Sequence, residues 1–149
     1  MRLWLLHPIA VHLPVALLLT GFAFHARALW KGDGEWTAPA SRWLLWLGTA
    51  GAWAALGLGL LAERTAPHVP SAWEVLGEHE TLAYWTCGVF SAVSAAAVWS
   101  ARKGEAGPRW GRAALAVLWL AGLGLLVATA EHGGRLVFDH NMGTAASAE

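Results

Sequence analysis

Four long apolar stretches, separated by polar links, dominate the hydropathy pattern of this chain. They cover residues 8–29, 42–62, 81–101 and 112–130. Each is long enough to cross a bilayer as a helix, which needs ~20 predominantly apolar residues. The pattern therefore predicts an integral membrane protein of the all-α class, a four-transmembrane-helix bundle.

The polar links set the expected organisation of the chain. Two links are short, at residues 31–35 and 103–108, and a longer one spans residues 63–80. Glycine and proline in the short links are typical of turns between helices. We expect one four-helix membrane domain over residues 1–142, followed by a flexible C-terminal tail at 143–149. No internal repeat is visible in the sequence.

Composition agrees with a membrane location. Hydrophobic residues make up 56% of the chain and charged residues 13%, whereas a soluble domain carries about a quarter charged residues. The formal net charge of zero gives no reason to expect nucleic acid as a partner. Cys87 stands alone, which excludes an internal disulfide, a Cys-x-x-Cys zinc or redox motif and covalent haem. The first stretch is too long for a signal peptide, so we expect residues 1–30 in the mature protein.

The distribution of Lys and Arg predicts the orientation. Seven of these residues flank the first and third links, whereas three lie on the opposite side. By the positive-inside rule, the first and third links face the cytoplasm. Both termini and the middle link are then expected on the extracytoplasmic side of the inner (cytoplasmic) membrane. The seven are Arg27, Lys31, Arg42, Arg102, Lys103, Arg109 and Arg112, and the three are Arg2, Arg64 and Arg135.

The first apolar stretch opens with an unusual group of polar and helix-bending residues: His7, Pro8, His12 and Pro14. Polar side chains at membrane depth are costly and usually face a bundle interior, so they indicate a functional site. Pro8 suits the first turn of a helix. Pro14 removes the N–H that would bond the Ala10 carbonyl, so we expect a bent backbone around His12.

Histidines from distant parts of the chain fall on one predicted membrane face. Six of the seven are expected on the extracytoplasmic side, and only His25 is expected on the cytoplasmic side. Convergent imidazoles serve metal or haem ligation, proton transfer or pH sensing. The six are His7, His12, His68, His79, His132 and His140.

The predicted site is a bis-histidine haem b centre, which needs two neutral imidazoles on facing helices. His12 and His79 fit best, because each lies just inside its span. His7 and His140 would form a second pair or surround the first. Arg135 would bind a haem propionate, since guanidinium suits bidentate carboxylate binding. Small residues below His12 would leave room for a porphyrin face or for direct helix contact: Ala16, Thr20 and Ala23.

Small residues also recur every four positions in the second and third stretches. This spacing is typical of membrane helices that approach closely. We therefore expect both stripes to face neighbouring helices. The first stripe is Gly51, Ala55 and Gly59, and the second is Gly88, Ala92 and Ala96.

Two motifs frame the chain: HPxxVHxP at residues 7–14 and GGRLVFxHxxG at residues 133–143. In these motifs, and in the histidine that leads the third span, the chain resembles the predicted membrane proteins of domain-of-unknown-function family 2231. The resemblance covers nearly the whole chain and implies His7, His12, His79 and His140 as site positions. Members of that family also look to occur fused to Rieske iron–sulfur modules, which implies redox work beside quinone or a cytochrome. Residues 140–143 read His-Asn-Met-Gly where the family more often has His-Gly-Val-Gly.

These patterns predict a membrane-embedded, b-type cytochrome-like electron-transfer subunit. It would carry haem b between quinol and an extracytoplasmic redox partner, a Rieske or cytochrome subunit on another chain, in a homo- or hetero-oligomer. Two alternatives stay open: binding or transport of copper or zinc ions, and a structural anchor or assembly subunit of a respiratory complex. The lack of Met-rich motifs disfavours copper(I). No nucleophile–base pair or phosphate loop is visible, which disfavours an independent enzyme.

Overall fold

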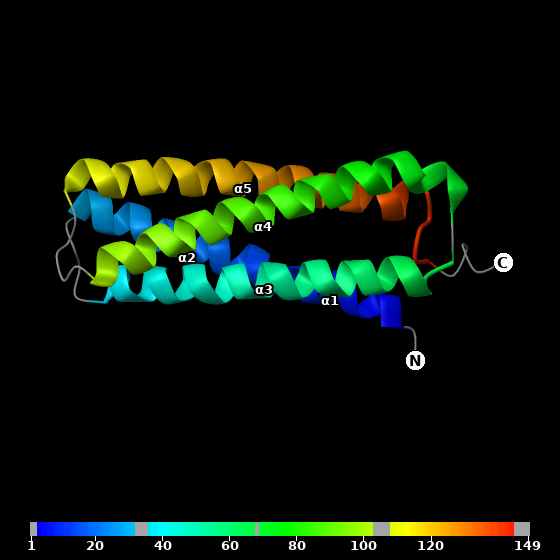
Figure 1. Cartoon of the computed structure of the whole chain (residues 1–149), viewed down its shortest axis with the longest axis horizontal. Coiled ribbons are helices and arrows are strands. Elements are labelled where there is room, and N and C mark those ends of the chain that lie inside the picture. The colour runs from blue at the N-terminus through cyan, green and yellow to red at the C-terminus, as the bar shows by residue number, and fades with distance from the viewer. Residues whose placement is uncertain (1–2, 32–35, 68, 103–107, 145–149) are drawn as a thin grey trace.

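The computed structural model describes residues 3–31, 36–67, 69–102 and 108–144, and within these ranges it contains helices and no strand. His68 and most of the two short links lie outside the described residues, as does most of the expected tail. In Figure 1 the long helices run side by side along one axis, and the described chain starts and ends at the same end of the bundle. The elements are η1 (Leu3–Leu5), α1 (Leu6–Ala10), α2 (His12–Lys31), α3 (Thr37–Thr65), η2 (Pro70–Ala72), α4 (Trp73–Arg102) and α5 (Arg109–Phe138).

Four helical segments of the described chain are long and apolar enough to cross a membrane: Leu3–Lys31, Thr37–Thr65, Pro70–Arg102 and Arg109–Phe138. The fold class predicted from the sequence, an all-α bundle of four spans, is confirmed. Each segment extends beyond the predicted stretch. The apolar stretch marks only the ~20 residues needed for the hydrocarbon core, and the helix continues past it. The remaining turns belong to the interfacial zone, where polar residues fit into the same helix.

The boundaries near the middle link and the C-terminus differ from the prediction. Residues 63–80 were expected as a link in which Ser71–Glu74 reads as a capping box, opening a short helix that leads into the third span or is continuous with it. The continuous form is observed, because α4 runs from Trp73 to Arg102, and α3 extends to Thr65. Likewise α5 does not end near Ala130 but continues to Phe138, so the GGR motif is helical. Hydropathy marks where a segment stops being apolar, whereas a helix ends only where its hydrogen bonds end. Both extensions bring polar residues onto helices at the same end of the bundle.

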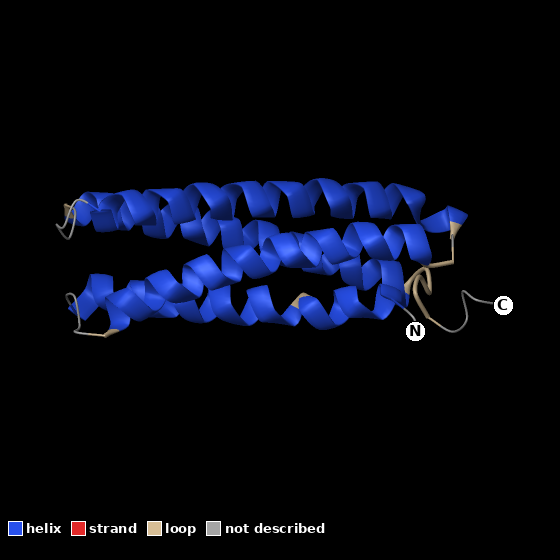
Figure 2. Ribbon diagram, turned by 60° about the horizontal axis from the view of Figure 1, so that its bottom comes forward, coloured by secondary structure: helices blue, strands red, loops and turns tan. Residues whose placement is uncertain are grey.

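The first span is interrupted, as the prolines predict. Val11 separates α1 from α2, and Figure 2 shows the break as a short tan segment between blue helices. The Val11 N–H donates to the His7 carbonyl at 3.1 Å, and the Val15 N–H lies 3.4 Å from the Val11 carbonyl. Pro14 has no N–H to continue the ladder to Ala10. The short helix α1 can therefore take its own direction, and it packs against α3.

The four spans form two hairpins that repeat one packing unit. The closest helix pairs are α2 with α3 and α4 with α5. In the first hairpin, a Cβ built on Gly48 would come within 2.7 Å of Leu18. In the second, a Cβ built on Gly122 would come within 3.0 Å of Phe90. Phe90 follows Leu18 by 72 residues, and Gly122 follows Gly48 by 74.

This correspondence corrects the expectation that the chain has no repeat. The core positions Leu45 and Trp119 also lie 74 residues apart, and both are almost fully buried. Spans one and three run in the same direction, so the repeat is a parallel one, related by an axis along the membrane normal. The side chains that fill the core differ between the two halves, so the sequence carries the repeat only in the spacing of a few glycines and histidines.

The core lies between the hairpins and the exterior is apolar. Its fully buried side chains include Leu18, Leu45, Phe90 and Trp119. Many large hydrophobic side chains are exposed on the outside, as expected of a surface that faces lipid. Tryptophans near the helix ends are exposed at positions suited to the membrane interface. They are Trp30, Trp43, Trp73, Trp99 and Trp110.

Candidate functional site

His7 is held between α1 and α3. Its Nδ1 lies 2.9 Å from the carbonyl oxygen of Ala55. Because a carbonyl can only accept, Nδ1 carries the hydrogen and donates it. Gly59 lies one turn further along α3, and a Cβ at this position would come within 3.1 Å of the His7 ring. The glycine therefore provides a seat in which the imidazole lies against the backbone of α3.

His79 is held in the same way between α4 and α5. Its Nδ1 donates to the carbonyl oxygen of Thr129 at 2.9 Å. A Cβ built on Gly133 would come within 3.2 Å of the His79 ring. The Thr129 hydroxyl lies 3.0 Å from the Thr86 hydroxyl, which ties α5 to α4 beside this acceptor. The second hairpin thus has its own imidazole, acceptor carbonyl and glycine seat.

These two units are equivalent positions of the repeat. His79 follows His7 by 72 residues, as Phe90 follows Leu18. The acceptor carbonyl and the glycine seat of the second hairpin each follow those of the first by 74 residues. Each hairpin therefore places one histidine at the start of its first span and locks the ring against its second span.

The two imidazoles meet between the hairpins. Their ring centroids lie 6.2 Å apart, and the ring planes are nearly perpendicular, at 83°. Both residues are partly buried. Since each Nδ1–H is used by a backbone carbonyl, Nε2 of each neutral ring keeps its lone pair. We call this arrangement the His7–His79 pair, and it offers two imidazole nitrogens from two halves of the molecule.

His12 lies on a different face. Its Nδ1 donates to the Pro8 carbonyl at 2.7 Å, within the same span, and the side chain is exposed. Five residues separate His7 from His12, and at about 100° per residue they cannot share one side of a helix. The structure therefore brings His7, and not His12, to His79. The small residues expected to lie below a porphyrin, Ala16, Thr20 and Ala23, are exposed on the outer surface of α2.

The other predicted positions lie around this end of the bundle or away from it. His140 is partly buried in the turn after α5. Arg135 lies on α5, with Nε 3.9 Å from the Asp139 carboxylate in a partly exposed pair one turn apart. His25 is at the opposite end, where its Nε2 lies 3.1 Å from the Arg112 carbonyl. Haem ligation or propionate binding by any of these residues stays a prediction.

His132 is a neighbour of the pair, and no specific role was predicted for it. Its Nδ1 donates to the Ala128 carbonyl at 2.9 Å, and its Nε2 lies 3.3 Å from the Glu78 carboxylate. It directly precedes Gly133, the seat of His79. Within the described ranges, no group of three or more His, Cys, Asp or Glu side chains is arranged to hold a metal ion. The centre of the site is therefore a pair.

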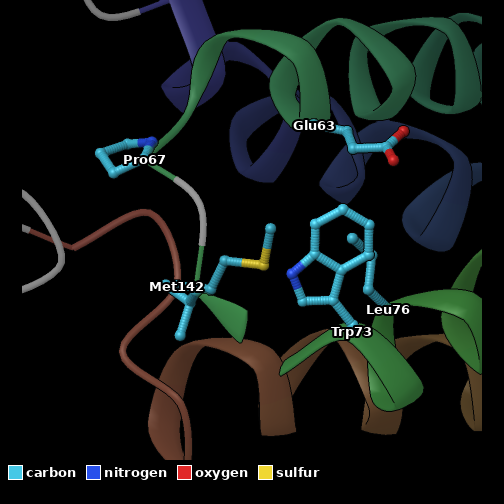
Figure 3. Close-up of a pocket in the computed structure, with 6 residues that line it drawn as sticks. Glu63, Pro67, Trp73, Leu76 and Met142 are labelled. Carbon is cyan, nitrogen blue, oxygen red and sulfur yellow. The ribbon is translucent and has the colours of Figure 1, made fainter. Parts of the chain in front are cut away.

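The segment after α5 closes this end of the bundle. Asn141 and Gly143 adopt positive φ angles of 55° and 75°, which Asn and Gly tolerate best. The turn therefore forms with Asn at position 141. The Met142 N–H donates to the Leu136 carbonyl at 2.9 Å. In Figure 3 the Met142 side chain lies next to Trp73, beside a cavity of ≈ 10 Å³, about the space for one water.

Sequence reasoning missed the parts of the site that are not histidines. Gly59 was assigned to a packing stripe, and the acceptor carbonyls have no side-chain signature. The second predicted stripe is wrong, because Gly88, Ala92 and Ala96 are all exposed. The signal that could have found the site was the pair of nearly equal offsets, 72 residues from His7 to His79 and 74 from Gly59 to Gly133.

Comparison with known proteins places the chain in a family without assigning an activity. A family model described as "Predicted membrane protein (DUF2231)" matches residues 5–146. No curated protein and no solved structure matches. The chain therefore belongs to this family of predicted membrane proteins, in agreement with the resemblance seen in its motifs.

Proposed function

We propose that this four-span membrane protein is a b-type cytochrome-like electron-transfer subunit in which His7 and His79 ligate one haem. The observation that carries the proposal is the His7–His79 pair. Two imidazoles from separate hairpins meet with ring centroids 6.2 Å apart, and each has its Nδ1–H tied to a backbone carbonyl. Ligating histidines commonly donate their second nitrogen in this way.

His7 and His79 would hold the haem iron through their Nε2 nitrogens, since each Nδ1–H is bound to a backbone carbonyl. A porphyrin supplies four ligands of its own, so a pair of imidazoles completes the coordination of its iron. This is why the pair supports haem better than zinc, which binds four ligands in a tetrahedron.

Residues of this chain orient the imidazoles and hold them in place. The Ala55 and Thr129 carbonyls fix the tautomer that leaves Nε2 free, and the two glycines let each ring lie close to a helix backbone. Because the rings are partly buried between hairpins, water has limited access to them. Haem supplies reversible one-electron chemistry when bound.

The proposed topology puts this end of the bundle on the extracytoplasmic side of the inner membrane. It follows from the excess of Lys and Arg in the first and third links. Electrons would come from a quinol in the bilayer and leave to a Rieske or cytochrome subunit, since this chain carries no Rieske-type Cys and His pairs. Arg135 and His140, at the same end, would face that partner or the haem propionates.

The test is a reduced-minus-oxidised absorption spectrum of the protein purified in detergent from haem-replete cells. We expect the spectrum of a low-spin b-type haem, with close to one haem per chain. His7→Ala and His79→Ala should each abolish it. His25→Ala, at the far end of the bundle, is the control and should keep it.

Two results would overturn the proposal. One is a colourless wild-type protein, with or without bound copper or zinc. The other is haem retained in both His7→Ala and His79→Ala. If His12→Ala loses the haem while His7→Ala keeps it, the pairing expected from the sequence is the right one. The folded state of each variant is checked by its far-ultraviolet circular dichroism.

A further inference from the structure

A groove lies on the outer surface of α4 and α5, at the end of the bundle that holds the His7–His79 pair. It is shallow and wide open to its surroundings, with ≈ 500 Å³ of space above its lining residues. The groove is lined by Glu74, Gly77, Glu78, Thr81, Leu82 and His132.

The polar groups of this groove are hydrogen-bond acceptors. The Thr81 hydroxyl donates to the Gly77 carbonyl at 2.9 Å, so its remaining capacity is to accept. His132 uses its Nδ1–H on the Ala128 carbonyl, and its Nε2 lies 3.3 Å from the Glu78 carboxylate, with which it pairs. The Glu78 oxygen that this contact leaves unused and the Thr81 hydroxyl oxygen can both accept a hydrogen from a ligand hydroxyl.

The repeat provides an internal comparison for these residues. The positions equivalent to the groove in the first hairpin are found by the offsets of 72 and 74 residues. Four of the six are large and apolar, whereas Leu82 corresponds to the smaller Ala10, and Glu74 to Arg2, which lies outside the described residues. Gly77, Glu78, Thr81 and His132 correspond to Leu5, Leu6, Ile9 and Leu58. The second hairpin therefore departs from the common scaffold here by losing bulk and gaining acceptors.

We infer that the groove binds the hydroxyl-bearing head group of a quinol. The ligand must donate hydrogen bonds, it must reach a site on the lipid-facing side of the bundle, and its ring can lie against Leu82. A quinol meets all three conditions, whereas the oxidised quinone carries acceptors only and would face an accepting wall. The site adjoins the pair, because Gly133, the seat of His79, follows His132 directly. The inference rests on the proposed function only for what happens to the electrons afterwards.

The test measures binding of duroquinol to the purified full chain in lipid nanodiscs, by equilibrium dialysis under anaerobic conditions. The decisive variant is Gly77→Leu, which restores the residue found at the equivalent position of the first hairpin. A Cβ at Gly77 meets nothing within 4 Å, so the variant fills the groove without disturbing the fold. We expect duroquinol affinity to fall about tenfold or more, because the added side chain occupies the space of the ligand.

The matched control is Gly57→Leu, also at an exposed helical glycine whose Cβ meets nothing within 4 Å. It should bind duroquinol as the wild type does. Glu78→Leu and His132→Leu should each weaken binding, since the first removes an acceptor and the second removes the side chain that holds Glu78 in place. Duroquinone, tested in parallel, should bind more weakly than duroquinol to the wild type.

Three results would overturn the inference: unchanged duroquinol affinity in Gly77→Leu, equal affinity for duroquinone, or no duroquinol binding with Zn²⁺ bound in a Glu78-dependent way. The last would identify a cation site. The haem spectrum of each protein is recorded alongside. If haem is bound but Gly77→Leu leaves duroquinol affinity unchanged, only the quinol site is wrong. If the protein is free of haem but binds duroquinol in a Gly77-dependent way, only the cytochrome proposal is wrong.

Discussion

The first hairpin, η1 to α3, and the second, α4 and α5, share a scaffold but not a surface. Both place a histidine at the start of one span, tie its Nδ1–H to a carbonyl of the other and seat it on a glycine. Outside that unit they diverge. The first hairpin is broken by prolines and has Leu or Ile at the positions equivalent to Gly77, Glu78, Thr81 and His132, whereas the second is unbroken.

The difference separates what the fold needs from what the site needs. Features present in both hairpins serve the packing of the helices and the His7–His79 pair. Both the packing and the pair need equivalent residues from the two halves. Features present in one hairpin alone are free to serve a ligand that approaches from one side. Variants at equivalent positions can therefore test each role, with one hairpin as the control for the other.

The largest effect is expected in the shared core. Trp119 and Leu45 are equivalent and almost fully buried, and the Trp119 Nε1 donates to the Leu18 carbonyl at 3.2 Å. Trp119→Ala should lower the free energy of unfolding by about 3–5 kcal/mol, and Leu45→Ala by about 2–5 kcal/mol. Unfolding by sodium dodecyl sulfate in mixed micelles measures both. A Trp119→Ala variant as stable as the wild type would contradict the burial of Trp119 between the hairpins.

The glycine contacts within each hairpin come next. Gly48→Ala should cost about 1–3 kcal/mol, because the new Cβ overlaps Leu18, which is held in the core. Gly122→Ala should cost less, since its Cβ would stand 3.0 Å from Phe90 against 2.7 Å at Gly48. The same detergent titration applies, with Gly124→Ala, which meets nothing within 4 Å, as the neutral control. Equal stability of all three variants would show that the close approach is not maintained in the membrane.

The glycine seats should respond alike in both hairpins. Gly59→Ala brings a methyl group to within 3.1 Å of the His7 ring, and Gly133→Ala brings one to within 3.2 Å of the His79 ring. Each ring must therefore shift by a few tenths of an ångström. Stability should fall by only about 1 kcal/mol. If the pair ligates haem, its reduction potential should move in the same direction in both variants, while Gly57→Ala leaves it unchanged. A shift confined to one seat would mean that the two imidazoles are not equivalent.

The number and type of spans could be predicted from the sequence, because lipid imposes a length of apolar chain that composition reveals directly. The break in the first span could also be predicted, since proline lacks an N–H wherever it stands. The ligand pairing expected from the sequence differs from the pair that the structure brings together. His7 and His12 are interchangeable in a linear reading, and only the direction that α1 takes after the break decides which one meets His79.

The glycine seats and the groove could not be read from single positions for a different reason. Gly59 and Gly133 look like ordinary packing glycines until the ring above each is known. Glu78 and His132 lie 54 residues apart and become partners only because α4 and α5 are neighbours. An alignment of the two halves would have identified both the glycine seats and the groove residues. It compares each residue of one hairpin with its equivalent in the other.

The smallest effect is expected at a bond that only the second hairpin has. Thr86 and Thr129 join α4 to α5 at 3.0 Å, and the residue equivalent to Thr86 is Pro14, which has no hydroxyl. A double-mutant cycle of Thr86→Val and Thr129→Val should give a coupling energy of about 0.6 kcal/mol, the usual size for such bonds in membranes. Thr65→Val, which loses only a bond within its own helix, should show no coupling to Thr129→Val. Zero coupling between Thr86 and Thr129 would mean that the Thr129 carbonyl alone holds His79, as the Ala55 carbonyl alone holds His7. The two histidines would then be held by the same set of contacts.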